Sequence, residues 1–72
     1  MMSFVRALRY AMAGDNITRA GWAEPRPAIS VEWHDTPDML PELRAFVGAD
    51  PKGTRWLGTQ EDLAASDWVL VS

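Results

Sequence analysis

The residues best suited to chemistry are an aromatic and a basic side chain that lie close together in the sequence. Trp22 follows a glycine and comes three residues after Arg19. An indole ring can stack on a nucleotide base, and a guanidinium can pair with a phosphate through charge-assisted hydrogen bonds. Residue type alone favours an ordinary structural role for Trp22, so both interpretations stay open at this point.

Groups that could catalyse a reaction are few. The chain has no Cys, no glycine-rich phosphate loop and no Ser in the strand–turn–helix context of a hydrolase. Its single His, His34, lies in a segment rich in Pro and Asp, which favours a solvent-exposed side chain over a catalytic base. The spacing of Glu61, Asp62 and Asp67 suits helix capping better than acid–base catalysis. We therefore predict no catalytic residues and a protein that works by binding.

Metals and cofactors are not expected either. One His and no Cys leave too few nitrogen and sulfur ligands for a metal site within one chain.

A chain of 72 residues predicts a single domain over 1–72, with a marginal core. Small domains without disulfides or metals often gain stability by oligomerisation. Four Trp, two Phe and one Tyr in so short a chain favour the same conclusion, because aromatic residues are common at interfaces.

The overall charge restricts the class of partner. The formal net charge is −3 at pH 7. A protein that binds duplex DNA or another nucleic acid polymer needs a basic surface, so we do not expect such a polymer as a partner. A few well-placed arginines would still be enough for one small anionic ligand. No apolar segment is long enough to span a membrane, and the N-terminus lacks the apolar stretch of a signal peptide. The predicted location is the cytoplasm.

The elements that must position these residues begin with an N-terminal helix. Ser3 can accept a hydrogen bond from a free N–H of the first turn, and Gly14 can end the helix in a left-handed conformation. Between them, apolar residues recur at the spacing of one helix face: Phe4, Ala7, Leu8, Ala11 and Met12. Arg6, Arg9 and Tyr10 lie off that face, and the simplest interpretation of the two arginines is a solvated surface.

The rest of the chain alternates short strand patterns with turns. Alternation of apolar and polar residues is clearest over 28–33, and further strands are predicted over 17–19, 43–47, 54–57 and 67–71. Loops are expected over 23–27 and 34–41, and residues 50–53 have the composition of a turn. Trp33 and Trp68 are expected in the core or at a subunit interface.

Residues 59–62 resemble a capping box, which predicts a short helical turn through Ala65. The predicted fold is α+β, with the N-terminal helix packed on a small antiparallel sheet of four to five strands.

Two stretches of sequence are similar to a known family. Near the N-terminus, FVRAL over 4–8, a glycine at 14 and ITRAGW over 17–22 resemble an opening of the form F-x-x-A-L … G … R-x-G-W. Near the C-terminus, WLGTQEDLAASDW over 56–68 resembles W-x-x-[ST]-Q-x-D-[LM]-L-A-x-D-W. The family is the second type of Thoeris anti-defence protein of phages, and the two motifs together span about half of the chain.

The resemblance implies a protein that is not an enzyme and that sequesters cyclic nucleotide immune signals without cleaving them. Glycocyclic ADP-ribose is the main ligand class, and some members take cyclic oligonucleotides. The resemblance also implies a homotetramer with ligand pockets between protomers, acting without a cofactor in the cytoplasm of the infected bacterial host. On this basis we expect ligand-binding residues at the following positions: Phe4, Arg19, Trp22, Trp56, Thr59, Gln60 and Asp62.

The expected roles follow from side-chain chemistry. Phe4 and Trp22 are expected to flank a purine base by stacking. Arg19 is expected to pair with phosphate, helped by either Arg6 or Arg55.

Hydrogen bonds to base edges or ribose hydroxyls are expected from Thr59, Gln60 and Asp62.

The middle of the chain departs from the family pattern. Residues 23–39 match the family poorly, and Pro41-Glu42-Leu43 stands where the family commonly has a P-H-[IL] element. The exact ligand is therefore left open.

Two other functions remain open at the level of sequence. The chain could be a protein-interaction module that grips a host protein with its aromatic residues. It could also be a small nucleotide-processing enzyme that depends on Asp62.

Overall fold

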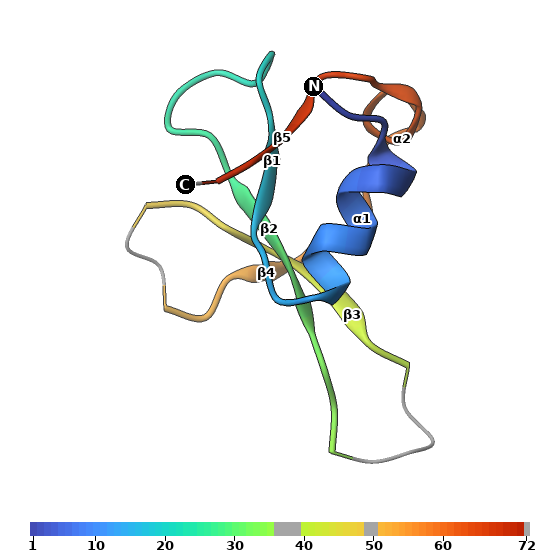
Figure 1. The fold of residues 1–72 in the computed structure, drawn as a ribbon. Helices are drawn as coiled ribbons and strands as arrows, with labels where there is room; N and C mark the ends of the chain where they lie inside the picture. The colour runs from blue at the N-terminus through green and yellow to red at the C-terminus, as the bar shows by residue number, and fades with distance from the viewer. Residues whose placement is uncertain (36–39, 49–50, 72) are drawn as a thin grey trace.

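The computed structural model describes residues 1–35, 40–48 and 51–71, which form two helices and a five-stranded sheet (Figure 1). Every strand pairing is antiparallel, and the first helix lies across one face of the sheet. This arrangement confirms the predicted α+β fold, with the number of strands at the upper end of the expected range.

Helix α1 (Phe4–Met12) begins and packs as its sequence predicts. The Ser3 hydroxyl accepts a hydrogen bond from the backbone N–H of Arg6 at 3.3 Å, so one free N–H of the first turn is satisfied. The buried residues of the helix lie on one face at the predicted spacing: Phe4, Ala7 and Ala11. Two small alanines on this face let the helix lie close to the sheet.

The strand order brings the two ends of the chain together. The strands are β1 (Ile17–Arg19), β2 (Ala28–Glu32), β3 (Glu42–Phe46), β4 (Thr54–Arg55) and β5 (Trp68–Leu70), and their order is β4-β3-β2-β1-β5. β5 returns past three strands to pair with β1, and Met2 forms a bridge to Trp68. The two sequence motifs from opposite ends of the chain are therefore neighbours in space.

The core lies between α1 and the central strands. Ile17 on β1 and Ile29 on β2 are direct partners across the sheet, and both are fully buried beneath the helix. Trp68 on β5 is the largest fully buried side chain, which confirms its predicted place in the core. Burying each such side chain stabilises the fold by roughly 1.5–3 kcal/mol.

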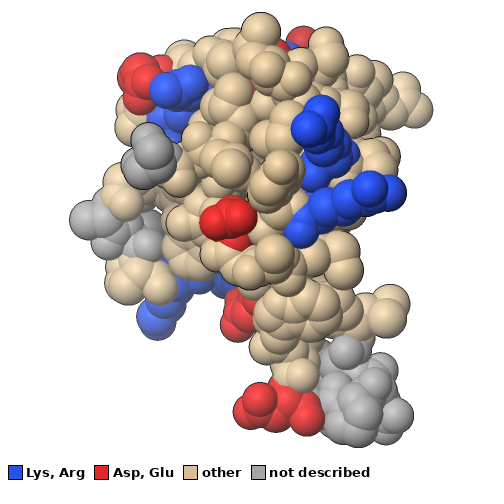
Figure 2. All heavy atoms as spheres, viewed as in Figure 1, with Lys and Arg blue, Asp and Glu red and all other residues tan. Residues whose placement is uncertain are grey.

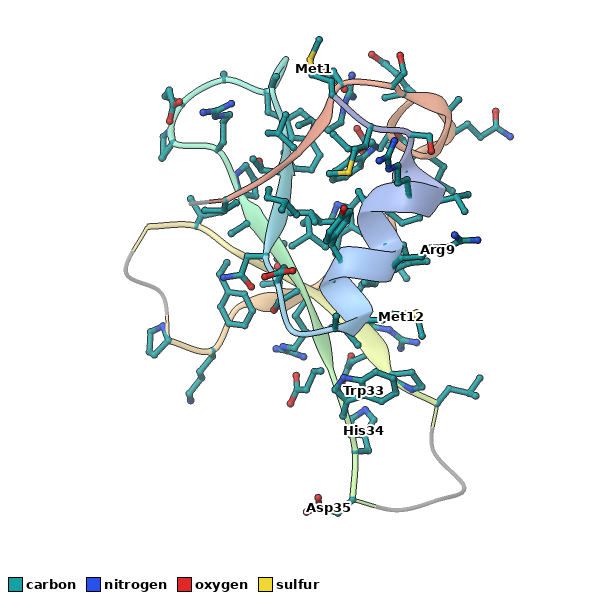
Figure 3. All side chains as sticks on the ribbon, in the orientation of Figure 1. Met1, Arg9, Met12, Trp33, His34 and Asp35 are labelled. Atoms are coloured by element: carbon teal, nitrogen blue, oxygen red, sulfur yellow. The ribbon has the colours of Figure 1, made fainter. Side chains whose placement is uncertain are left out.

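Trp33 was expected either in the core or at a subunit interface, and the structure shows that it is not part of the core. The predicted strand over 28–33 ends at Glu32, and the Trp33 side chain is 56% exposed. The β2–β3 hairpin extends beyond the last turn of α1, so the helix does not cover this indole (Figure 3). The other alternative, a place at a subunit interface, remains a prediction.

The other strands differ from their predicted bounds by one or two residues. The predicted strands over 43–47, 54–57 and 67–71 are observed as β3, β4 and β5, whereas β1 has its predicted bounds. Alternation predicts a strand but not the point at which its ladder of hydrogen bonds ends. Residues 36–39 of the predicted loop and Asp50 of the predicted turn lie outside the described residues.

Helix α2 (Gln60–Ala64) is short and capped as predicted. The Thr59 hydroxyl accepts from the Asp62 N–H at 3.1 Å, and an Asp62 carboxylate oxygen accepts from the Thr59 N–H at 3.3 Å. This reciprocal pair is a capping box with Asp in place of the usual Glu. Within the described ranges, neither helix has the length and apolar character needed to cross a membrane.

Candidate functional site

Aromatic residues from distant parts of the sequence form one cluster at the N-terminal end of α1. Neighbouring ring centroids lie between 5.2 and 6.5 Å apart, in tilted or edge-on arrangements. The members are Phe4, Trp22, Trp56 and Trp68. Trp68 is fully buried, whereas Trp22 and Trp56 are half-buried and so retain surface at the rim of the cluster.

Arg19 ties this aromatic cluster to α2 and to the start of β5. Its Nε donates to Asp67 Oδ1 at 2.7 Å, and its Nη1 donates to Asp62 Oδ1 at 2.8 Å. The same Asp62 oxygen accepts from the indole N–H of Trp22 at 3.2 Å. The guanidinium carbon also lies 6.0 Å from the centre of the Trp22 ring, a cation–π distance. Asp62 therefore does more than cap α2.

These contacts shift the acid–base behaviour of all three charged groups. Hydrogen bonding to Asp67, and then to Asp62, raises the pKa of the Arg19 guanidinium. The hydrogen bond from Arg19 lowers the pKa of Asp67 against the opposing effect of partial burial. Partial burial raises the pKa of Asp62, but hydrogen bonds from Arg19 and Thr59 outweigh it and leave that pKa lowered. Neither carboxyl is suited to deliver a proton near neutral pH.

The structure gives Arg19 and Phe4 roles that differ from those expected. Three of the Arg19 nitrogens already donate to carboxylates, so within one protomer the guanidinium has little left for a phosphate. Phe4 is only 9% exposed and packs against Trp56 and Trp68, so within one protomer little of its ring is open to a ligand. In this position Phe4 supports the Trp56 ring from behind.

The expected hydrogen-bonding residues of α2 are only partly available. The side chains of Thr59 and Asp62 are engaged in the capping box, and Asp62 also binds Arg19. Gln60 is exposed on the first turn of α2. Of these three residues, Gln60 is the one whose donor and acceptor groups face solvent.

A cavity of about 590 Å³ lies beside the aromatic cluster and shares Trp56 with it. It forms where β4 ends and the chain passes the start of β3. Its walls combine apolar and charged side chains: His34, Leu40, Pro41, Glu42, Leu43, Arg55, Trp56 and Leu57. We call this the Trp56 cavity. Ligand pockets have volumes of about 300–1,000 Å³ and a similar mixture of apolar walls with a few polar groups.

Arg55 is the cation of this cavity that remains available to a ligand. Its side chain is 72% exposed, and its Nε lies 3.9 Å from Glu42 Oε2, beyond hydrogen-bonding distance. Glu42 also lies 3.4 Å from Nε2 of His34. The His34 side chain is only 22% exposed, so the expected solvent-exposed histidine is instead part of the cavity wall.

Trp56 is held by a hydrogen bond from its backbone and by the close approach of Gly58 to its ring. Its backbone N–H donates to the Leu43 carbonyl at 2.8 Å, which extends the β3–β4 pairing by one hydrogen bond. Gly58 has a φ of +63°, and a Cβ at that position would lie 2.7 Å from the Trp56 ring. Only glycine suits both the left-handed backbone and this close approach.

The sequence motifs contain every member of the aromatic cluster, but their gathering into one cluster was not predicted, and most of the Trp56 cavity was missed. The motifs contain Trp22, Trp56 and Trp68, and their spacing in the sequence needs only a returning strand to bring them together. His34 and Glu42 come from the poorly matching middle of the chain. Their proximity depends on the β2–β3 register, in which Glu32 pairs with Glu42, and no short sequence pattern signals this.

The chain is similar to a known family of domains over nearly all of its length. A family model described as "Tad2-like: Thoeris anti-defense 2-like domain" matches residues 2–71. No curated protein matches the chain. The matched range includes both motifs on which the resemblance depends.

Proposed function

Because the chain belongs to the Tad2-like family of Thoeris anti-defence domains, we propose that it binds a cyclic nucleotide immune signal and sequesters it without cleaving it. Family membership supports the anti-defence role. The observation that carries the ligand-binding part is the Trp56 cavity, whose walls include both an aromatic ring and an exposed arginine.

Trp56 is proposed to stack on the base of the ligand. Its ring is backed by Phe4 at a centroid distance of 5.8 Å and by Trp68 at 5.9 Å. A ring fixed in this way loses little conformational freedom on binding, which favours affinity. A base–aromatic stack contributes about 1–3 kcal/mol.

Arg55 is proposed to pair with phosphate in place of Arg19. Its long contact with Glu42 can be exchanged for a charge-assisted hydrogen bond to a phosphate oxygen, whereas Arg19 would have to give up two close carboxylates. His34 in the cavity wall offers a further polar group to the base or ribose. Glycocyclic ADP-ribose and cyclic oligonucleotides contain both features, a base and a phosphate.

A homotetramer with ligand between protomers is part of the proposal. Leu40 and Leu57 at the rim of the Trp56 cavity are 85% and 78% exposed. Apolar side chains exposed together in this way favour cover by another protein surface. A neighbouring protomer would bury these leucines and enclose the ligand. The site of action would be the cytoplasm of the infected host.

Retention of the ligand rather than turnover is also proposed. Asp62, which accepts a hydrogen bond from Trp22, and Asp67 both have lowered pKa values and are paired with Arg19. A general acid near neutral pH needs a raised pKa instead.

Isothermal titration calorimetry on the full chain tests the proposal. The panel contains glycocyclic ADP-ribose, cyclic dinucleotides and linear ADP-ribose. We expect at least one cyclic ligand to bind. Arg55→Gln should weaken its binding about tenfold or more, because glutamine cannot form the charge-assisted hydrogen bond to phosphate.

The matched control is Arg26→Gln, which removes the same charge from a residue that pairs with Glu24 and does not line the Trp56 cavity. Its affinity should equal that of the unmodified protein. Failure of every ligand in the panel to bind would contradict the proposal.

A protein-interaction module is the second candidate, and the exposed Trp33, Leu40 and Leu57 favour it. A host protein that binds the chain, and whose binding is abolished in Leu57→Ala but kept in Arg55→Gln, would support this candidate over nucleotide binding.

A further inference from the structure

A second concave surface lies on α1, on the side that faces away from the sheet. Arg6, Arg9, Tyr10 and Ala13 line a groove of about 330 Å³, which we call the α1 groove. Residues three, four and seven apart share one face of a helix, so these four side chains project together. Figure 2 shows basic side chains gathered over α1, and Figure 3 shows Arg9 pointing away from the sheet.

The two arginines of the α1 groove differ from the other arginines in their lack of a carboxylate partner. The pairs elsewhere are Arg19 with Asp62 and Asp67, Arg26 with Glu24, Arg44 with Glu32, and Arg55 with Glu42. Among the described residues, no Asp or Glu oxygen lies within 4.0 Å of the Arg6 or Arg9 guanidinium. Helix α1 itself contains no acidic residue.

This lack of partners is unexpected for a chain of net charge −3, in which carboxylates outnumber basic side chains. Two like charges one helical turn apart repel each other and destabilise the helix slightly. A bound anion would remove this repulsion, since each guanidinium presents several N–H donors in a fixed planar arrangement.

We propose that the α1 groove binds the diphosphate group of a small phosphate ester or free pyrophosphate. Arg6 and Arg9 each donate to one phosphoryl unit, and the two linked units match two guanidinium groups held on adjacent turns. Ala13, one turn beyond Arg9, adds little bulk to the groove, and Tyr10 forms one wall. The α1 groove shares no lining residue with the Trp56 cavity, so this site does not depend on the proposed nucleotide function.

Titration of the ¹⁵N-labelled full chain with inorganic pyrophosphate at constant ionic strength tests this site. We expect saturable shifts of the amide signals over residues 6–13. The double variant Arg6→Gln/Arg9→Gln should weaken this binding by about a hundredfold, roughly tenfold for each guanidinium removed. Both side chains are exposed, so the variant should keep the fold and the dispersed spectrum.

The matched control is Arg26→Gln/Lys52→Gln, which changes the net charge by the same amount at residues outside the α1 groove. It should keep the shifts and the affinity. Shifts that never saturate, or equally weakened binding in both double variants, would overturn the proposal in favour of general charge attraction.

A second arm uses ADP to identify the source of the diphosphate. Tighter binding of ADP than of pyrophosphate, reduced to the pyrophosphate level by Tyr10→Ala, would identify a nucleotide whose base contacts Tyr10. Equal affinities would identify free diphosphate as the ligand. ADP binding that is unaffected by Arg6→Gln/Arg9→Gln would overturn the assignment.

Discussion

At the scale of single residues, the proposed binding function depends on how firmly the Trp56 ring is held. Phe4 and Trp68 support the ring within the aromatic cluster, and Gly58 leaves the space that the ring needs. The position of the Trp56 ring is therefore set by two aromatic residues packed against it and by the space at Gly58.

Substitution of Gly58 by Ala tests this dependence. The added methyl group would lie 2.7 Å from the Trp56 ring and displace it, so we expect nucleotide affinity to fall together with stability. Gly48→Ala is a matched control, because Gly48 has a φ of +61° against +63° for Gly58 but nothing within 4 Å of its Cβ position.

Both variants should be destabilised by about 1–2 kcal/mol in urea unfolding, because alanine is strained in the left-handed backbone conformation. Only Gly58→Ala should weaken ligand binding in calorimetry. Equal affinities in the two variants would show that the position of the Trp56 ring does not matter.

The limits of sequence-based prediction are clearest for the arginines. The proximity of Arg19 and Trp22 follows from their spacing of three residues across the turn after β1, and it is observed. The occupation of Arg19 by Asp62 and Asp67 is not predictable from spacing, since both partners come from the other end of the chain. The availability of Arg55 likewise depends on a distance of 3.9 Å that only the fold defines.

At the scale of elements, α2 is a short helix that needs anchoring. Five residues are too few for a stable isolated helix, so α2 depends on its capping box and on tertiary contacts. Asp62 provides both, because it caps the helix, binds Arg19 on β1, and offers its carbonyl to the indole N–H of Trp68 at 2.9 Å.

Thr59→Ala should destabilise the protein by about 0.5–2 kcal/mol, since the N–H of Asp62 would have no side-chain acceptor. Urea unfolding followed by circular dichroism measures this change. Thr59→Ser keeps the hydroxyl and should remain close to the unmodified stability. Destabilisation of the same size in both variants would mean that the cap contributes little.

The β2–β3 hairpin shows what a sequence pattern can and cannot predict. Alternation over 28–33 correctly predicts a strand, but alternation cannot show where the covering helix ends. The α1 helix ends at Met12, and the hairpin continues past it, which leaves Trp33 exposed and brings His34 into the cavity wall.

At the scale of the whole molecule, the link between the two ends of the chain is electrostatic as well as hydrogen-bonded. Arg19 on the first strand joins Asp62 and Asp67 near the C-terminus. The pKa values of both carboxyls are lowered in the folded state relative to the unfolded value of about 3.9. A lowered carboxyl pKa contributes stability that is fully present above the unfolded pKa and is lost as the pH falls through the folded pKa.

We therefore expect the urea midpoint to be steady from pH 7 to about pH 5 and to fall below about pH 4, as Asp62 and Asp67 become protonated. Arg19→Gln should lower the midpoint at pH 7 and flatten its decline in acid, because the cation that lowers both pKa values is gone. Identical acid profiles for the two proteins would contradict this assignment.

The α+β class, the first helix and all five strands follow from alternation, helical spacing and turn residues. The strand order does not, because the pairing of β5 with β1 closes a long loop whose partners no local pattern identifies. The family motifs supplied part of what local patterns lack, since both of them converge on this pairing.

Native mass spectrometry of the full chain mixed with glycocyclic ADP-ribose or a cyclic dinucleotide tests sequestration most directly. We predict an oligomer that carries the ligand, and release on heating of a molecule whose mass and chromatographic mobility are those of the ligand added. An assembly that takes up no ligand from the panel, or that releases a cleaved product, would contradict the proposed function.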